Sequence, residues 1–294
     1  MQNRYQDTPP SIDDVCAKAL HLPCSPAILP RLAVALQSDV TSAAHIERLI
    51  SLDTSLATAT LRLANSAVYG PCAVDTLEGA ILRLGAKELY RLAALVLIGR
   101  WGSGVADVGR APNDFSRHAL CTAIAAEVLA ETSGRVDPQI AYTAGLVNEV
   151  GRLAMVLSCA TFLPQIRAHC ELRRTSWEEA ESVVLGFNNA EVSWRLLTAW
   201  KFPPILSETA RHLAAPAKAT EESAALVAHV HAARFLAGVL EETKAVAEVA
   251  PPLHAAFLAE SGLPTEMILS VAPEVAARVE QRWGNRLLDG ILPQ

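Results

Sequence analysis

Two short motifs in the first half of the sequence contain residue types that could do chemistry. Gly102-Ser103-Gly104 resembles the start of a glycine-rich loop that binds phosphates, but Asp107 stands where the third glycine belongs and no strand pattern precedes it. Cys121 follows His118 by three residues, which places a thiol and an imidazole on one face of a helix. Nothing else in the sequence marks a nucleophile site. We therefore interpret the first motif as a linker and assign no nucleophile to the second.

The elements that position these residues are predicted to be helices almost throughout. Between Thr54 and Tyr69 the apolar positions recur at offsets of 3, 7 and 11 from Leu56, which is one face of a helix. The strict alternation of apolar and polar residues that marks a strand is almost absent. The predicted fold class is all-α. Similar helical spacing is found in 28–36, 77–84, 115–129, 140–157, 192–200 and 224–240.

Residues that favour helix ends support this prediction. Asp53 is placed to cap the helix that starts at Thr54, and Gly85 is expected to separate two short helices. Asn113 and Gly134 bracket a long helix.

Two stretches have the composition of linkers. The stretch 101–112 contains three glycines, and a weaker boundary lies at Ala250-Pro251-Pro252. We therefore predict one main domain that consists of two helical lobes, followed by a C-terminal helical extension. The predicted bounds are 11–245 for the domain, 11–101 and 112–245 for its lobes, and 246–294 for the extension.

Composition narrows the classes of function. Apolar residues make up 51% of the 294 residues and charged residues 19%, which excludes a disordered chain. The net charge of −6 argues against nucleic acid as a partner. Apolar runs stay short of the 18 residues that a membrane span needs, and residues 1–10 lack the apolar stretch of a secretory signal. Six cysteines without a CxxC pair suit a reducing compartment, so we expect a cytoplasmic protein without membrane contact.

Four ordered segments carry a resemblance to a known family. They are Leu22-Pro23 with Pro26-Ala27, the run LRLANSA at 61–67, the run ILRLG at 81–85, and the run GLVNEVGRL at 145–153. This set resembles the HDOD domain, a branch of the HD-domain superfamily that is found in bacterial signalling proteins. The resemblance covers roughly residues 11–240 and implies a fold with an N-terminal helical lobe and an HD-like lobe.

The resemblance also implies a comparison with HD-superfamily phosphohydrolases, whose histidines and aspartates hold divalent metals that activate water. The early histidine of that set matches His118, and the adjacent His-Asp pair falls on Asn148 and Glu149. A neutral amide is a poor metal ligand, and the extra methylene of glutamate moves its carboxylate by more than about 1 Å, whereas ligand distances are held within about 0.2 Å. The resemblance therefore implies a vestigial pocket.

Three further positions complete this comparison. A family histidine before an Ala-Glu pair falls on Asn189, another family histidine matches His212, and Ala233 replaces the late aspartate. His118, Glu149 and His212 remain as donors that could hold a single iron or zinc ion. The alternative is that Glu149, with Arg152 three residues on, forms a hydrogen-bonded polar cluster that only stabilises the fold. We predict no metal and no cofactor.

A second group of polar residues lies in the 54–69 segment. Arg62, Asn65, Ser66 and Tyr69 fall at offsets of 0, 3, 4 and 7, which places them on one polar stripe of the predicted helix. The stripe could receive a partner or a small ligand. The interpretation we favour is structural: Asn65 and Ser66 near a helix end bond the neighbouring turn and fix how the two lobes meet.

The function expected from these observations is a regulatory or scaffolding module in bacterial signal transduction, without catalysis. It would act through contacts with other signalling proteins, with a nucleotide-like small ligand in the vestigial pocket as a further expectation. The alternative is a metal-dependent phosphohydrolase with an altered ligand set.

Overall fold

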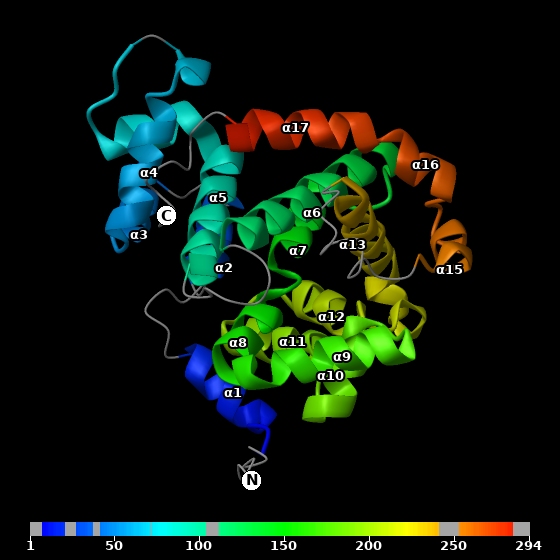
Figure 1. The fold of residues 1–294 in the computed structure, drawn as a ribbon. Helices are drawn as coiled ribbons and strands as arrows, with labels where there is room; N and C mark the ends of the chain where they lie inside the picture. Colours follow the sequence, from blue (N-terminus) through cyan, green and yellow to red (C-terminus); the bar gives the residue numbers. More distant parts are fainter. Residues whose placement is uncertain are drawn as a thin grey trace.

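The computed structural model of the protein describes residues 8–20, 28–37, 42–70, 72–103, 112–240 and 253–284. Within these ranges every regular element is a helix, as Figure 1 shows. The predicted all-α fold class is confirmed.

The first group of helices packs around α5. The group comprises α2 (Ile28–Gln37), α3 (Ala43–Ile50), α4 (Thr54–Ala64) and α5 (Leu77–Ser103). The Asp53 carboxylate accepts hydrogen bonds from the backbone N–H groups of Ser55 (2.9 Å) and Leu56 (3.1 Å), so its predicted role as the cap of α4 is confirmed. Gly85 interrupts α5 with a φ of 71°, a left-handed value that glycine adopts without steric cost. The predicted break at Gly85 is therefore also confirmed.

The second group contains the larger part of the core. Its inner helices are α6 (Pro112–Ser133), α7 (Pro138–Val147), α8 (Val150–Cys159), α11 (Asn189–Ala199), α12 (Pro204–His212) and α13 (Glu221–Leu240). The hairpin of α9 (Leu163–Arg173) and α10 (Trp177–Leu185) lies beside them. Short 3-10 turns occupy Ala160–Phe162 and Pro216–Lys218 in this group, and another occupies Ala67–Tyr69 in the first group. A Cβ atom added to Gly145 would lie 2.9 Å from the Cα of Ala123 and 2.9 Å from the carbonyl oxygen of Thr122. The small residues of α6 and α7 therefore allow their backbones to pack in close contact.

The first helix of the chain packs on the second group rather than on the first. α1 (Ile12–Leu20) contacts α8 and α11. The Lys18 ammonium donates to the carbonyl oxygen of Leu157 (2.7 Å), and Asp13 pairs with Arg195 (2.6 Å). The lobe predicted over 11–101 therefore begins, in space, at α2.

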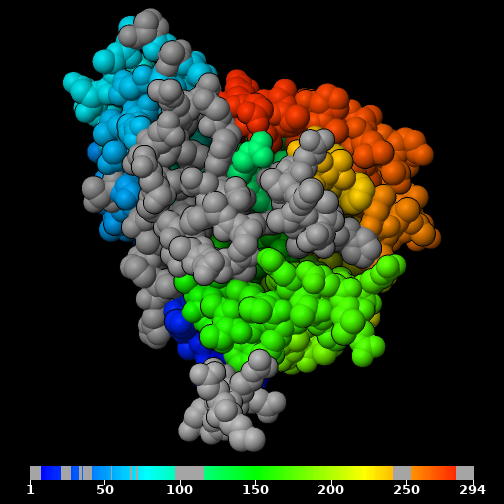
Figure 2. Space-filling view, viewed as in Figure 1, coloured from blue at the N-terminus to red at the C-terminus, as the bar shows by residue number. Residues whose placement is uncertain are grey.

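The C-terminal helices α15 (Ala255–Glu260), α16 (Thr265–Ser270) and α17 (Ala272–Gly284) follow α13. In Figure 1 α17 lies along α6 and its end reaches α5. Val275 and Val279 are buried on its inner face. Figure 2 shows the first group, the second group and this extension at separate parts of one face of the molecule. Most of the predicted linker, residues 104–111, and the boundary at Ala250-Pro251-Pro252 lie outside the described residues.

Two predicted helices end earlier than the apolar spacing indicates. The helix predicted over 54–69 ends at Ala64, and a 3-10 turn follows it. The helix predicted over 140–157 breaks at Asn148 and Glu149, where Glu149 has φ and ψ of −110° and 21°. Both interruptions occur at polar residues singled out above from the sequence, Asn65 with Ser66 and Asn148 with Glu149.

Two helical stretches, 138–173 and 221–240, satisfy a length and composition criterion for a membrane span. Within the fold, 61% and 72% of their most apolar windows are buried. Core helices with this degree of burial satisfy the same criterion, so these stretches are weak evidence for membrane contact.

Candidate functional site

The break between α7 and α8 positions the predicted pair Asn148 and Glu149 in the interior. The Asn148 amide donates to the carbonyl oxygen of Gly145 (2.7 Å), and the carbonyl oxygen of Asn148 accepts from the Ser193 hydroxyl (3.1 Å). The Ser193 hydroxyl in turn accepts from the backbone N–H of Gly151 (2.8 Å). The hydroxyl of Ser193 thus joins the start of α8 to α11.

Gly151 makes this close contact possible. A Cβ atom at Gly151 would lie 2.3 Å from the carbonyl oxygen of Asn189 and 2.5 Å from the backbone nitrogen of Ser193. Only a residue without a side chain fits between these backbone atoms. The crossing of α8 and α11 therefore sets where Asn148 and Asn189, two of the predicted pocket residues, lie relative to each other.

Glu149 belongs to a buried group of charges that we call the sealed cluster, defined as Glu149, Arg152, Glu178 and Arg234. The Arg234 guanidinium donates to Glu149 (3.0 Å) and to Glu178 (2.7 Å). Arg152 lies 3.2 Å from Glu149 and 3.7 Å from Glu178. The four side chains are between 4% and 12% exposed, so these charges neutralise one another with little help from water.

The arginines determine the charge state of the cluster. Burial raises the pKa of Glu178, but the charges of Arg234 and Arg152 outweigh it and hold that pKa below its ordinary value. Burial lowers the pKa of Arg234, but Glu178 and Glu149 raise it above its ordinary value. The cluster is therefore two carboxylates matched by two guanidinium groups.

Glu181 lies beside the sealed cluster, close enough to interact electrostatically with Arg152 and Glu178. Its carboxylate accepts from the backbone N–H (2.8 Å) and the side-chain amide (3.4 Å) of Asn189. Burial raises the pKa of Glu181 to about 7, and the charge of Glu178 adds to this effect against the opposing charge of Arg152. Asn189 is thus an anchor for a buried carboxyl group.

The residues around Asn148 and Glu149 do not suit a divalent metal ion. A carboxylate that binds a metal must offer oxygen lone pairs, and two guanidinium groups already pair with the Oε1 atom of Glu149. The two guanidinium groups would also repel a metal cation bound to the Glu149 carboxylate. Within the described residues, no three or more His, Cys, Asp or Glu side chains lie close enough together to hold a metal. The family's metal chemistry therefore has no suitable donor set at this pair.

The other predicted pocket residues lie at different places. His118 is buried on α6, and Ala233 is buried on α13, where its neighbour Arg234 reaches the sealed cluster. His212 at the end of α12 is 17% exposed, and its imidazole lies 3.5 Å from Glu208 of the same helix. Hydrogen bonds thus connect Asn148 to α11, which carries Asn189, and Glu149 to α13, which carries Ala233.

The predicted polar stripe is wrong, because its helix ends before three of its four residues. Arg62 lies on α4, whereas Asn65 forms the end of the helix and bonds both the backbone N–H and the carbonyl oxygen of Val74 at 2.7 Å. The predicted structural role of Asn65 at a helix end is thus confirmed, but the loop that it fixes lies within the first group and not between the lobes. Within the described residues the buried Ser66 hydroxyl makes no hydrogen bond, and Tyr69 points elsewhere, donating to Glu88 (3.3 Å).

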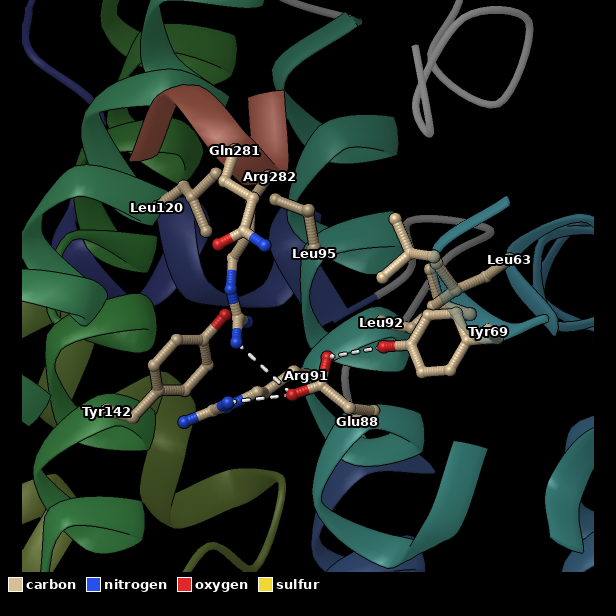
Figure 3. Close-up of a pocket in the computed structure, with 11 residues that line it drawn as sticks. Leu63, Tyr69, Glu88, Arg91, Leu92, Leu95, Leu120, Tyr142, Gln281 and Arg282 are labelled. Atoms are coloured by element: carbon tan, nitrogen blue, oxygen red, sulfur yellow. Dashed lines mark hydrogen bonds and ion pairs between the residues drawn. The ribbon is translucent and has the colours of Figure 1, made fainter. Parts of the chain in front are cut away.

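Tyr69 donates a hydrogen bond to a member of a second charged group. We call this group the junction cluster and define it as Lys87, Glu88, Arg91, Glu127 and Arg282. Glu88 accepts from Arg91 (2.8 Å) and from Arg282 of α17 (3.2 Å). Glu127 on α6 pairs with Lys87 (2.9 Å) and with Arg91. Figure 3 shows Arg282 entering between Tyr142 and Glu88. The cluster thus joins α5, α6 and α17.

Two cavities lie beside the junction cluster, and Arg91 and Tyr142 line both. The smaller, of about 230 Å³, is drawn in Figure 3 and includes Tyr69, Glu88 and Arg282. The larger, of about 690 Å³, lies between the two lobes. Among the described residues that line these two cavities, none belongs to the predicted vestigial pocket.

Sequence reasoning missed most of the charged partners in both clusters. A usable signal was present, because Arg234 is the only Asp, Glu, Lys or Arg in 224–240 and Glu127 is the only one in 118–130. A single charge in an apolar helix predicts a buried ion pair. The spacing gives no information about the partner, which is contributed by another helix.

A model of the HDOD domain family matches residues 22–216. No curated protein matches the sequence significantly.

Several solved structures share the fold. One is an HDOD domain protein of unknown function from Geobacter sulfurreducens, with a TM-score of 0.70 and 20% identity over 91% of this chain and 97% of that one. A "Putative phosphohydrolase" from Shewanella amazonensis SB2B has a TM-score of 0.65 and 23% identity over 95% and 98% of the two chains. A "Putative signal transduction protein" from Marinobacter aquaeolei VT8 has a TM-score of 0.70 and 19% identity over 97% of this chain and 62% of that one. At these identities the likeness shows a common fold.

Proposed function

The chain belongs to the HDOD domain family, and from this premise we propose that it is a non-catalytic regulatory or scaffolding module of bacterial signal transduction. It would act in the cytoplasm through contacts with other signalling proteins, and neither nucleic acid nor a membrane would be a partner. A small ligand would bias those contacts.

One observation carries this proposal: the guanidinium of Arg234 lies 3.0 Å from the Glu149 carboxylate. In a metal-dependent phosphohydrolase the acid at this position of the family pattern must hold a cation that activates water. Here the positive charge at the carboxylate is a side chain of the protein, which cannot lower the pKa of a bound water as a metal does. The position therefore supports a structural role.

Hydrolysis assays test the proposal. The purified protein would be incubated with cyclic dinucleotides, (p)ppGpp and nucleotides, each with Mn²⁺, Fe²⁺ or Mg²⁺, and its metal content would be measured by elemental analysis. We expect product formation no faster than in metal-containing buffer, and metal far below one ion per chain. Turnover that Glu149→Gln abolishes and that Glu191→Gln, an exposed control on α11, preserves would establish the phosphohydrolase alternative instead.

The proposed regulatory role through protein contacts is tested by isolating a partner. We expect a pull-down from the source cells to return a signalling protein whose complex with this chain survives gel filtration when both are purified. Failure of every recovered protein to form such a complex would contradict the regulatory role, whatever the hydrolysis assays give.

A further inference from the structure

The larger cavity has the position and size of a small-ligand site. It lies between α2 and α5 of the first group and α7 and α12 of the second, and it measures about 690 Å³. Ligand pockets typically occupy about 300–1,000 Å³ and often lie where two lobes meet. A ligand there would contact both lobes and so could affect how they pack.

The cavity offers flat apolar surfaces. Tyr90 of α5, Tyr142 of α7 and Phe202 before α12 all line it. The guanidinium of Arg91 lies over the Tyr142 ring, 4.9 Å from its centre, in a cation–π contact. Planar aromatic groups pack favourably against aromatic side chains such as those of Tyr90 and Phe202.

The cavity also offers a positive charge that is accessible to solvent. The Lys87 side chain is 43% exposed, although its ammonium pairs with the buried Glu127. An ammonium has three N–H donors, so the bond to Glu127 leaves donors for a second acceptor. Burial and the charge of Arg91 lower the pKa of Lys87, while Glu131 and Glu88 oppose this effect. An added anion would favour the charged form of Lys87.

The negative charge that lines the same cavity is already engaged. Asp137 caps α7 and accepts from the backbone N–H groups of Gln139 (2.8 Å) and Ile140 (3.0 Å). The positive end of the helix dipole offsets its charge. At the facing start of α12 no side chain caps the helix, and Ile205 and Leu206 line the cavity there. The start of α12 adds the positive end of a helix dipole to the charge of Lys87, although Pro203 and Pro204 have no N–H group to donate.

From these observations we propose that the cavity between the lobes binds a planar aromatic molecule with an anionic group, the chemistry of a nucleoside monophosphate. The ring packs among Tyr90, Tyr142 and Phe202, and Lys87 pairs with the phosphate. This inference rests on the proposed regulatory function and places its ligand between the lobes instead of in the vestigial pocket.

Isothermal titration calorimetry tests the proposal with the four ribonucleoside monophosphates as probes, and with adenosine and ribose 5-phosphate as fragments. We expect at least one monophosphate to bind about tenfold or more tightly than either fragment, since each fragment lacks one of the two contacts. Equal binding of monophosphate and fragments, or no binding of any monophosphate below about 1 mM, would overturn the proposal.

Variants of two lining residues test whether the monophosphate binds in the cavity between the lobes. Lys87→Gln should weaken binding of the monophosphate about tenfold and leave adenosine unaffected, and Tyr90→Leu should weaken both. Lys218→Gln, at an exposed lysine that is not part of the cavity lining, is the matched control and should change neither. Thermal unfolding without ligand confirms that each variant is folded before titration. Unchanged binding in folded Lys87→Gln and Tyr90→Leu proteins would contradict the assignment of the cavity.

Chromatography of the titrated samples separates this proposal from the proposed function. Binding without product supports both. Conversion of the nucleotide would contradict the non-catalytic function, and it would leave the position of the ligand to be decided by the same variants.

Discussion

The sealed cluster and the junction cluster both pair two glutamates with two arginines, but the junction cluster also contains Lys87, and the two clusters differ in their access to solvent. In the sealed cluster two arginines bond Glu149 and Glu178, and none of the four side chains is more than 12% exposed. In the junction cluster Lys87 is 43% exposed, and Arg91 lines two cavities. The comparison indicates that Glu149 and its neighbour Asn148 are part of the core, whereas charge that solvent can reach lies between the lobes.

The largest expected effect tests whether the sealed cluster is structural. Replacing its central cation by Arg234→Met leaves Glu149 and Glu178 buried with Arg152 as their only arginine in the cluster, which should lower the free energy of unfolding by about 3–5 kcal/mol. Chemical denaturation measures this loss. Arg195→Met, which removes a partly exposed ion pair with Asp13, is the control and should cost less than about 1 kcal/mol.

A second variant shows whether charge balance is the cause. Adding Glu149→Gln to Arg234→Met leaves Arg152 and Glu178 as a balanced pair, so part of the lost stability should return. If the double variant is less stable by the sum of both single losses, the charges of Arg234 and Glu149 act independently and the cluster is not a unit.

The next effect concerns the close backbone contact between α8 and α11, which lies beside the sealed cluster. Gly151→Ala brings a methyl group to 2.3 Å from the carbonyl oxygen of Asn189, so α8 and α11 must separate. We expect a loss of about 3 kcal/mol by chemical denaturation. Gly79→Ala is the matched control, because its Cβ would meet only side-chain atoms at 2.9 Å, which can move. Equal losses in the two variants would show that α8 and α11 tolerate separation.

A third test uses pH to compare the carboxyl groups of the two regions. The pKa of Glu181 is raised to about 7, mainly by burial, whereas Arg282 and Arg91 overcome burial and lower the pKa of Glu88. A raised carboxyl pKa means that the folded state binds the proton more tightly than the unfolded state. Its contribution to stability is therefore complete below about pH 4.5 and is lost as pH rises to about 7.

Glu181→Gln should remove this dependence. Relative to the parent, the variant should gain about 2 kcal/mol of stability between about pH 5 and pH 8, measured by denaturation at each pH. The difference between the two proteins is the relevant quantity, because the lowered pKa of His229 acts in the opposite direction in both. A parallel pH dependence in parent and variant would contradict a raised pKa for Glu181.

The helices were predictable from the sequence because their signals are local. Asp53 caps α4 through the next three residues, and Gly85 bends α5 through its own φ value. The helix ends that were missed depend on contacts outside the helix. Asn65 ends α4 while it bonds Val74, nine residues away in the sequence. Apolar periodicity contains no information about such partners.

In the candidate site, too, the residues close together in the sequence were predictable and their distant partners were not. The family resemblance located Asn148 and Glu149, and the spacing to Arg152 indicated a hydrogen-bonded polar cluster on one helix. The structure shows Glu149 and Arg152 paired at 3.2 Å, with Glu149 at the break just before α8. The partner Arg234 lies 85 residues further along the chain, and only the packing of α13 on the core places it beside Glu149. The cavity between the lobes has no sequence signal, because its lining residues come from four separate helices and the turns before two of them.

The smallest effect is expected in the junction cluster. Arg282 and Glu88 are 26% and 28% exposed, so Arg282→Met should lower the free energy of unfolding by only about 1 kcal/mol. Because solvent reaches this pair, its coupling energy from a double-mutant cycle with Glu88→Gln should fall between about 0.05 M and about 0.5 M NaCl. The coupling of Arg234 with Glu149 should change much less over the same range, since salt screens buried charges weakly. Equal salt dependence in the two cycles would mean that both clusters are open to solvent to the same degree, and the contrast between a structural and an accessible group of charges would be lost.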